Sequence, residues 1–189
     1  TDSAIAKFLA TRMKSLREQG VLGDDVVKNL EQVQGRLRLS EMLDALTRPS
    51  GISEEQLLCW AEQLDLAAPG VEAQVRDLLG QVGELQRLEG RKAELTRKQN
   101  VDANRVKKIF ENQSRLRENI KSMEHVRTGN LLERYMNDMD TEENDLIQTR
   151  RRIEEFEEEK ANADREITKL VLQVSMAAKS VQKQCDPDK

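Results

Sequence analysis

The C-terminal part of this chain has seven consecutive heptads with apolar residues at most of their first and fourth positions, and Lys160 and Glu142 are the main polar exceptions. A repeat with this spacing forms a stripe on one side of an α-helix, and the helix is stable only when another helix covers that stripe. The pattern therefore predicts one long helix over residues 132–181, in a coiled coil or helical bundle. The first positions of its heptads are Leu132, Met139, Leu146, Ile153, Lys160, Ile167, Val174 and Val181. The fourth positions are Tyr135, Glu142, Thr149, Phe156, Ala163, Leu170 and Ala177.

The composition points to the same class of fold. Charged residues make up 35% of the chain and aromatic residues only 3%. Long runs of Ala, Glu, Lys, Leu and Arg with few helix breakers are typical of long helices and coiled coils. No segment alternates apolar and polar residues with the period of two that a half-buried strand needs. We therefore expect an all-α protein, with a small N-terminal helical module followed by long helices in an antiparallel hairpin or coiled coil.

Proline divides the chain into three segments. Residues 1–70 contain Pro49 and Pro69 and predict a module of short helices. Residues 71–184 contain no proline and predict a long-helix coiled-coil region, and residues 185–189 form a polar tail.

The long-helix region has two candidate turns, Gln99–Asp102 and Thr128–Asn130. If both are turns, the region contains three helices, and if neither is, it forms one continuous rod. The heptad registers before and after Thr128–Asn130 do not join, so we expect a turn there. With both turns, the helices would cover about 71–98, 102–127 and 131–184.

The N-terminal module is expected to contain four or five short helices. Apolar stripes at helical spacing begin near Ser3, Asp24, Ser40 and Ser53. Ser53, with Gln56 three residues later, resembles a capping box, in which each side chain binds the backbone N–H of the other residue. We expect Trp60 to anchor the core, because it is the largest apolar side chain of the module. The predicted core residues are Leu43, Leu57, Trp60 and Leu64.

Residues 39–83 contain two short loops between helices, Pro49–Ser53 and Asp65–Val71, and in each a glycine precedes a β-branched residue. Together with the helix Leu39–Leu46, they resemble a degenerate EF-hand pair like that of the leucine-zipper EF-hand-containing transmembrane family. The resemblance implies a regulatory helix–loop module near coiled coils, and a mitochondrial protein. The first loop has no acidic ligand, and the second offers Asp65 but no Glu at the twelfth position, so we expect little or no calcium binding. The other interpretation is an ordinary pair of helices joined by a turn.

No catalytic or metal-binding pattern stands out in the sequence. The single histidine, His125, has no nearby Ser, Cys or acid arranged as a triad, and phosphate-binding glycine loops are missing. Two distant cysteines, Cys59 and Cys185, cannot complete a zinc site with one histidine. We therefore expect no enzyme activity, no cofactor and no metal. Two cysteines without a disulfide framework favour a reducing intracellular compartment, either cytoplasmic or mitochondrial.

Charge is distributed unevenly along the chain. The net charge of −4 argues against a protein that binds nucleic acid. Residues 91–121 are rich in Lys and Arg, whereas residues 138–159 are rich in Asp and Glu around a central Arg150–Arg152 cluster. We interpret the two stretches as complementary halves of one bundle, in which interhelical ion pairs set the register. The alternative is contact between residues 91–121 and a membrane surface.

These features predict a structural or interaction protein that binds a second copy or other subunits of an assembly. The heptad seam needs a cover, because each large apolar side chain left in water costs about 1.5–3 kcal/mol. That cover is an earlier helix of the chain, a second copy or another subunit. The alternatives are an EF-hand-like regulatory module and a peripheral membrane-binding protein. The residues expected to form the seam are Leu146, Ile153, Phe156, Lys160, Ile167, Leu170, Val174 and Val181.

Overall fold

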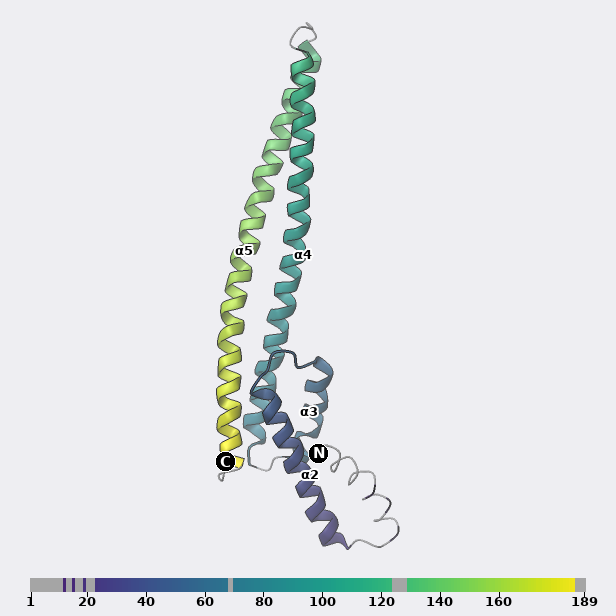
Figure 1. The fold of residues 1–189 in the computed structure, drawn as a ribbon, viewed down its shortest axis with the longest axis vertical. Helices are drawn as coiled ribbons and strands as arrows, with labels where there is room; N and C mark the ends of the chain where they lie inside the picture. The colour runs from purple at the N-terminus through teal and green to yellow at the C-terminus, as the bar shows by residue number, and fades with distance from the viewer. Residues whose placement is uncertain are drawn as a thin grey trace. The chain divides into compact units, whose positions relative to one another are not determined.

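The computed structural model of the chain describes residues 23–67, 70–123 and 129–185, together with Arg12, Ser15 and Gln19, but not the side chains of residues 63–67. The regular secondary structure within these residues is entirely helical (Figure 1). The helices are α2 (Asp24–Leu46), α3 (Glu54–Ala67), α4 (Glu72–Ser122) and α5 (Gly129–Cys185). The long helices α4 and α5 pack against each other as an antiparallel hairpin, which confirms the predicted fold class.

The chain divides into two compact units, and both long helices pass through both of them. One unit, which we call the core unit, consists of Thr1–Arg87 and Ile167–Lys189. The other, which we call the hairpin unit, consists of Leu88–Glu166. The sequence analysis placed its boundary near residue 70, at the start of α4. The division in the structure falls inside the long helices instead, because their ends complete the core of the first unit.

The core unit is held together by one hydrophobic cluster to which all four described helices contribute. Met42, Leu43 and Leu46 of α2 are at most 1% exposed, and each contributes about 1.5–3 kcal/mol by its burial. Two side-chain hydrogen bonds support this packing: Gln86 Nε2 of α4 donates to the carbonyl of Ile52, in the turn before α3, at 2.6 Å, and Gln182 of α5 donates to Asp44 of α2. The other members of the cluster are Leu39, Leu57, Val75, Leu78, Leu79, Val82, Val174, Ala178 and Val181.

Helix α2 replaces two of the short helices that the sequence predicts. It runs without interruption through Gly35 and Ser40, so the prediction of separate helices there, with Ser40 as a cap, is wrong. A glycine inside a helix costs only about 1 kcal/mol relative to alanine. The apolar residues buried after it outweigh this cost. The N-cap position is occupied by Gly23, and Asp24 and Asp25 lie in the first turn, where their charges favour the helix dipole.

Helix α3 begins with the predicted capping box. Gln56 N donates to Ser53 Oγ at 3.2 Å, and Ser53 N donates to Gln56 Oε1 at 3.1 Å. The preceding turn contains Gly51, whose φ of +92° favours glycine. Of the predicted core residues, Leu43 and Leu57 are buried, and Trp60 is half-buried and packs against the cluster. The side chain of Leu64 lies outside the described residues.

Helix α4 continues through the first candidate turn, so the interpretation of Gln99–Asp102 as a turn is wrong. Asp102 lies on the side of α4 that faces α5. Its carboxylate accepts a hydrogen bond from Arg152 and does not cap the start of a helix. Helix α5 begins at Gly129, so Asn130 is already helical, and Thr128 lies outside the described residues. The break between the long helices therefore lies between Ser122 and Gly129, which leaves two long helices instead of three.

Candidate interaction surface

The heptad seam of α5 lies against α4 of the same chain, except at its first predicted position, Leu132, which is exposed. In the hairpin unit, Leu146 and Thr149 are buried, and Ile153, Phe156 and Lys160 are half-buried. The described part of this unit consists of α4 and α5 alone, so each helix is buried by the other. In the core unit, Val174 and Val181 are buried within the hydrophobic cluster. The two remaining predicted seam residues, Ile167 and Leu170, are half-buried there.

Ion pairs between the two helices align the hairpin unit. Positions on α4 rise from Arg91 to Arg105 as their partners on α5 fall from Glu159 to Asp145. Arg91 Nη2 lies 2.8 Å from Glu159 Oε2, and Arg105 Nη2 lies 2.7 Å from Asp145 Oδ1. A third pair joins Lys92 to an α5 carboxylate at 2.5 Å. Residues 91–105 of the basic stretch thus pair with acidic residues of α5, as predicted for complementary halves of one bundle, whereas no ion pair joins the Lys and Arg side chains of residues 107–121 to the described part of α5.

At the centre of this pattern the charges are reversed, with the acidic side chain on α4 and the basic side chain on α5. Arg152 Nε donates to Asp102 Oδ2 at 2.9 Å, and Arg152 Nη2 donates to Asp102 Oδ1 at 3.1 Å. The same Nη2 also donates to Thr149 Oγ1 at 3.0 Å, and Thr149 is fully buried. The hydrogen bonds that Arg152 donates to Asp102 raise the pKa of Arg152 above its ordinary value. A shift of α5 along α4 would bring like charges together, so the blocks specify one register.

Polar residues also occupy several seam positions. Lys160 Nζ donates to Gln99 Oε1 at 2.8 Å, and Gln99 Nε2 donates to Glu157 Oε1 at 2.8 Å. Nearer the end of α4, Gln113 Nε2 donates to Glu143 Oε2 at 3.0 Å, although Gln113 is only 2% exposed. Within the described residues, every buried side-chain N and O atom has a hydrogen-bond partner. The seam is therefore satisfied within one chain.

The outer surface of the hairpin unit keeps unpaired charge. Five cationic side chains of α4 are exposed and form no ion pair with the described residues: Lys107, Lys108, Arg115, Arg117 and Lys121. On α5, Asp138, Asp140, Glu154 and Glu158 are exposed in the same way. Exposed residues of the opposite sign, Glu111 and Glu118 on α4 and Arg134 and Arg151 on α5, stand among them.

Six large apolar side chains of the hairpin unit are exposed within the described residues, and four of them lie on one side, while Val101 and Leu131 lie elsewhere. On α5, Leu132, Met136 and Ile147 lie within about 60° of one another around the helix axis, because each residue advances the helix by about 100°. They are 42%, 51% and 58% exposed. Phe110 of α4 is 45% exposed and lies on the same side, because the guanidinium of Arg150 stands 5.6 Å from the centre of its ring. We call these four residues and Arg150 the Phe110–Ile147 face.

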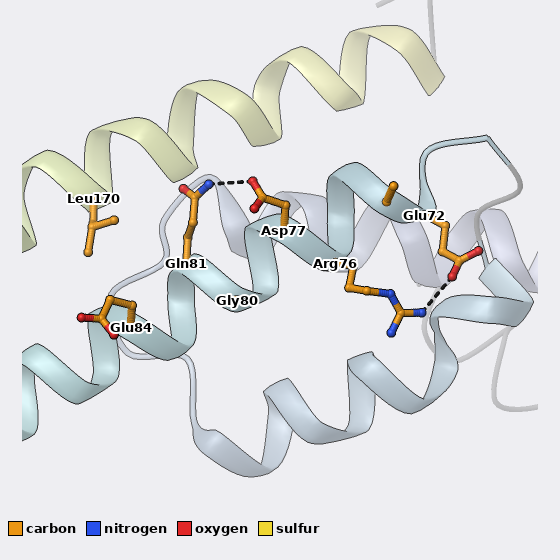
Figure 2. A pocket seen from close by; sticks show the side chains of 8 residues that line it. Glu72, Arg76, Asp77, Gly80, Gln81, Glu84 and Leu170 are labelled. Carbon is orange, nitrogen blue, oxygen red and sulfur yellow. Dashed lines mark hydrogen bonds and ion pairs between the residues drawn. The ribbon is translucent and has the colours of Figure 1, made fainter.

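The core unit contains an open groove of about 700 Å³ along the first turns of α4 (Figure 2). Ala73 and Gly80 of α4 and Leu170 of α5 supply its apolar lining. Its charged side chains are engaged by neighbours, since Arg76 Nη2 lies 2.8 Å from Glu72 Oε1 and Gln81 Nε2 donates to an Asp77 oxygen at 2.8 Å (Figure 2). Glu84 also lines the groove, and its hydrogen bonds with Arg87 hold its pKa below the ordinary value.

The described residues provide no group of three or more His, Cys, Asp or Glu side chains that could hold a metal ion. Among the described helices, none is long and apolar enough to cross a membrane. Cys59 and Cys185 are both exposed thiols. His125 lies outside the described part of the chain.

The sequence analysis missed Asp102, Phe110 and Ile147 as residues of interest. Asp102 lies seven residues before Ile109, which itself lies seven before Leu116, so extending that heptad backwards identifies it as a seam residue. Phe110 and Ile147 fall beside seam positions, and only their place outside the repeat marks them as exposed apolar residues. Comparisons with protein-family models, with curated proteins and with solved structures find no match to this chain.

Proposed function

We propose that this chain is a non-catalytic structural protein whose hairpin unit binds another protein through its outer surface. The observation that carries the proposal is the exposure of Phe110, Leu132, Met136 and Ile147 on one side of a hairpin whose seam is already satisfied. Exposed apolar patches with a polar rim are typical of interaction sites. The face has two such patches, Phe110 with Ile147 and Leu132 with Met136, which Asp140 and Glu143 separate on α5. Polar residues within the seam make it less stable than an apolar seam would be, but they favour a single register of the two helices. A single register suits a component that presents a defined surface.

A binding role also agrees with the chemistry of the described residues. The ionisable side chains of the hairpin unit are paired across the helices or exposed, and such groups lack the desolvated environment in which catalytic groups are tuned. The exposed thiols of Cys59 and Cys185 support a reducing intracellular compartment as the place of this interaction.

The proposal is tested by comparing the full-length chain with two variants, each of which adds one charge to the surface of the hairpin unit. Ile147→Glu places the charge on the Phe110–Ile147 face. Val101→Glu is the matched control, because Val101 is 64% exposed and lies nine residues, about two and a half turns, from Phe110 on α4. We expect quantitative affinity capture to recover a protein, either this chain or another, with the wild type and the control but not with Ile147→Glu. Equal recovery with all three proteins would contradict the proposal.

A further inference from the structure

We infer that the occupant of the Phe110–Ile147 face is a second copy of this chain, with α4 of one hairpin unit lying over α5 of the other. This inference rests on the proposed function and adds the identity of the partner and the symmetry of the contact. Its basis is that the face is complementary to itself both in charge and in the placement of its apolar residues.

The apolar residues of the face lie within two regular stripes. On α4 the stripe consists of Lys107, Phe110, Ser114, Arg117 and Lys121, which follow one another by three or four residues. On α5 the stripe consists of Leu132, Met136, Asp140, Glu143, Ile147, Arg150 and Glu154, again by steps of three or four. Such steps keep side chains on one side of a helix. The stacking of Arg150 on Phe110 places both stripes on the same side of the hairpin unit.

The two stripes carry opposite net charge. The charged residues of the α4 stripe are all cationic, whereas the α5 stripe has three carboxylates and one arginine. The bond between Gln113 and Glu143 sets the level of one helix against the other. One turn further towards the end of α4, Arg117 therefore lies level with the segment of α5 that contains Asp140.

Charge selects one of the two ways in which two such faces can meet by two-fold symmetry. With the axis parallel to the helices, α4 of each copy lies over α5 of the other at the same level, and basic residues face acidic ones. With the axis across the helices, α4 lies over α4 and α5 over α5, so that like charges meet. In a two-fold contact the same patch is used on both copies, so each favourable pair occurs twice. The first arrangement also places every helix beside antiparallel neighbours, as in a four-helix bundle.

A second copy fits this face better than an anionic membrane does. A membrane surface attracts basic residues, and the carboxylates of Asp140, Glu143 and Glu154 stand among the apolar side chains that would have to insert. A second copy places the Lys and Arg side chains of its α4 against these carboxylates.

The first experiment measures the mass of the full-length chain by light scattering at concentrations from about 1 to 500 µM. We expect the mass to rise from 21.7 kDa to twice that value. We expect Ile147→Glu to raise the dissociation constant at least about tenfold, and Val101→Glu to change it less than about twofold. Circular dichroism of both variants should match the wild type, because both positions are exposed.

The second experiment tests the charge pairing with two further variants. One carries Lys107→Glu and Arg117→Glu, which make both stripes acidic, and the other carries Asp140→Lys and Glu154→Lys, which make both basic. We expect each variant alone to dimerise at least about tenfold more weakly than the wild type, and a mixture of the two to recover a heterodimer.

A third experiment tests the symmetry. In a background of Cys59→Ser and Cys185→Ser, one protein carries Ser114→Cys on α4 and another carries Asp140→Cys on α5. The proposed axis brings these two positions together, so we expect a disulfide-linked heterodimer on mixing and little homodimer from either protein alone. Homodimers of the Ser114→Cys protein without heterodimer would overturn the arrangement.

Other outcomes separate this inference from the proposed function. A chain that stays monomeric at every concentration, or a dimer that Ile147→Glu leaves intact, overturns the second-copy inference. If the monomeric chain captures a different protein through the face, the proposed function stands and the inference fails. Sedimentation of the monomer with vesicles containing phosphatidylserine, lost in Ile147→Glu, overturns both in favour of membrane contact.

Discussion

The bond between Arg152 and Asp102 offers a direct test of how the charge blocks hold the hairpin unit. Three consecutive arginines of α5 have different surroundings, although sequence alone does not separate them. Arg150 stands over the ring of Phe110, and Arg151 lies 4.0 Å from Glu155 with 81% of its side chain exposed. The Arg152 side chain is 37% exposed and binds Asp102, whose side chain is only 12% exposed.

Arg152→Ala should therefore destabilise the protein far more than Arg151→Ala. Arg152→Ala leaves the Asp102 carboxylate without the two hydrogen bonds that compensate its burial. An unsatisfied buried acceptor costs about 1–3 kcal/mol. Because Arg152 is itself partly exposed, solvent screening reduces the effect, and we expect about 2 kcal/mol, or a fall in Tm of about 4–8 °C. Arg151→Ala removes an exposed pair, so we expect less than about 0.5 kcal/mol.

The assay is urea unfolding followed by circular dichroism, with Asp102→Ala and the double variant completing a double-mutant cycle. We expect a coupling free energy of about 1 kcal/mol or more between the two positions, since each single variant strands the other partner. Equal losses for Arg152→Ala and Arg151→Ala, or a coupling near zero, would refute the reasoning that this pair holds the register.

Three further predictions concern single features of the helices. Ser53→Ala removes the cap of α3 and should lower the free energy of unfolding by about 1 kcal/mol in urea titration. Gly90→Ala should raise it by about 1 kcal/mol, because Gly90 is in a helix with open space where a Cβ would lie, whereas Gly51→Ala should lower it, because φ is +92° there. A hydrogen bond from Lys98 lowers the pKa of Glu94 below its ordinary value. The pKa of Glu94 is thus lower in the folded protein than in the unfolded one. The ionised Glu94 therefore stabilises the fold above the unfolded pKa, and this stabilisation is lost as the pH falls through the folded pKa. Glu94→Gln should make Tm fall less steeply on acidification, and an unchanged slope would contradict this.

The fold class follows from sequence because helical periodicity is a property of consecutive residues. The heptads of α5 and the capping box at Ser53 each depend on spacings of three, four or seven, and the structure contains both the long helix and the cap. The charge complementarity of α4 and α5 was also visible, since blocks of opposite sign need no knowledge of the loop that joins the helices.

The errors arose where local signals competed with packing. Gly35 and the segment Gln99–Asp102 are turn signals when read alone, but both lie inside helices. Burial of apolar residues beyond Gly35 outweighs its helix penalty, and Asp102 is stabilised by Arg152 fifty residues away. The boundary of the core unit could not be predicted from the sequence either, because it depends on the start of α4 and the end of α5 packing into the same hydrophobic cluster.

The candidate surface was predictable only in part. The seam residues of α5 are recognisable by their repeat, but the sequence left open which helix covers them. Once α4 is known to be that helix, Phe110 and Ile147 stand out as large apolar side chains that it leaves exposed. A candidate interaction face of this kind is defined by what remains uncovered, which requires the partner helix and its register.

The central claim is that α4 and α5 of one chain close on each other within the hairpin unit. Its most direct test is the distance between spin labels at Ser114→Cys and Asp140→Cys in one chain, with Cys59 and Cys185 replaced by Ser, in excess unlabelled protein. Antiparallel neighbours have axes about 10 Å apart, so we predict a short distance, set by this spacing and the label arms, that dilution leaves unchanged. A distance near 40 Å, which about 26 residues of continuous helix would span at about 1.5 Å each, would contradict the account. A short distance that disappears on dilution would contradict it as well, because the seam would then be closed between chains.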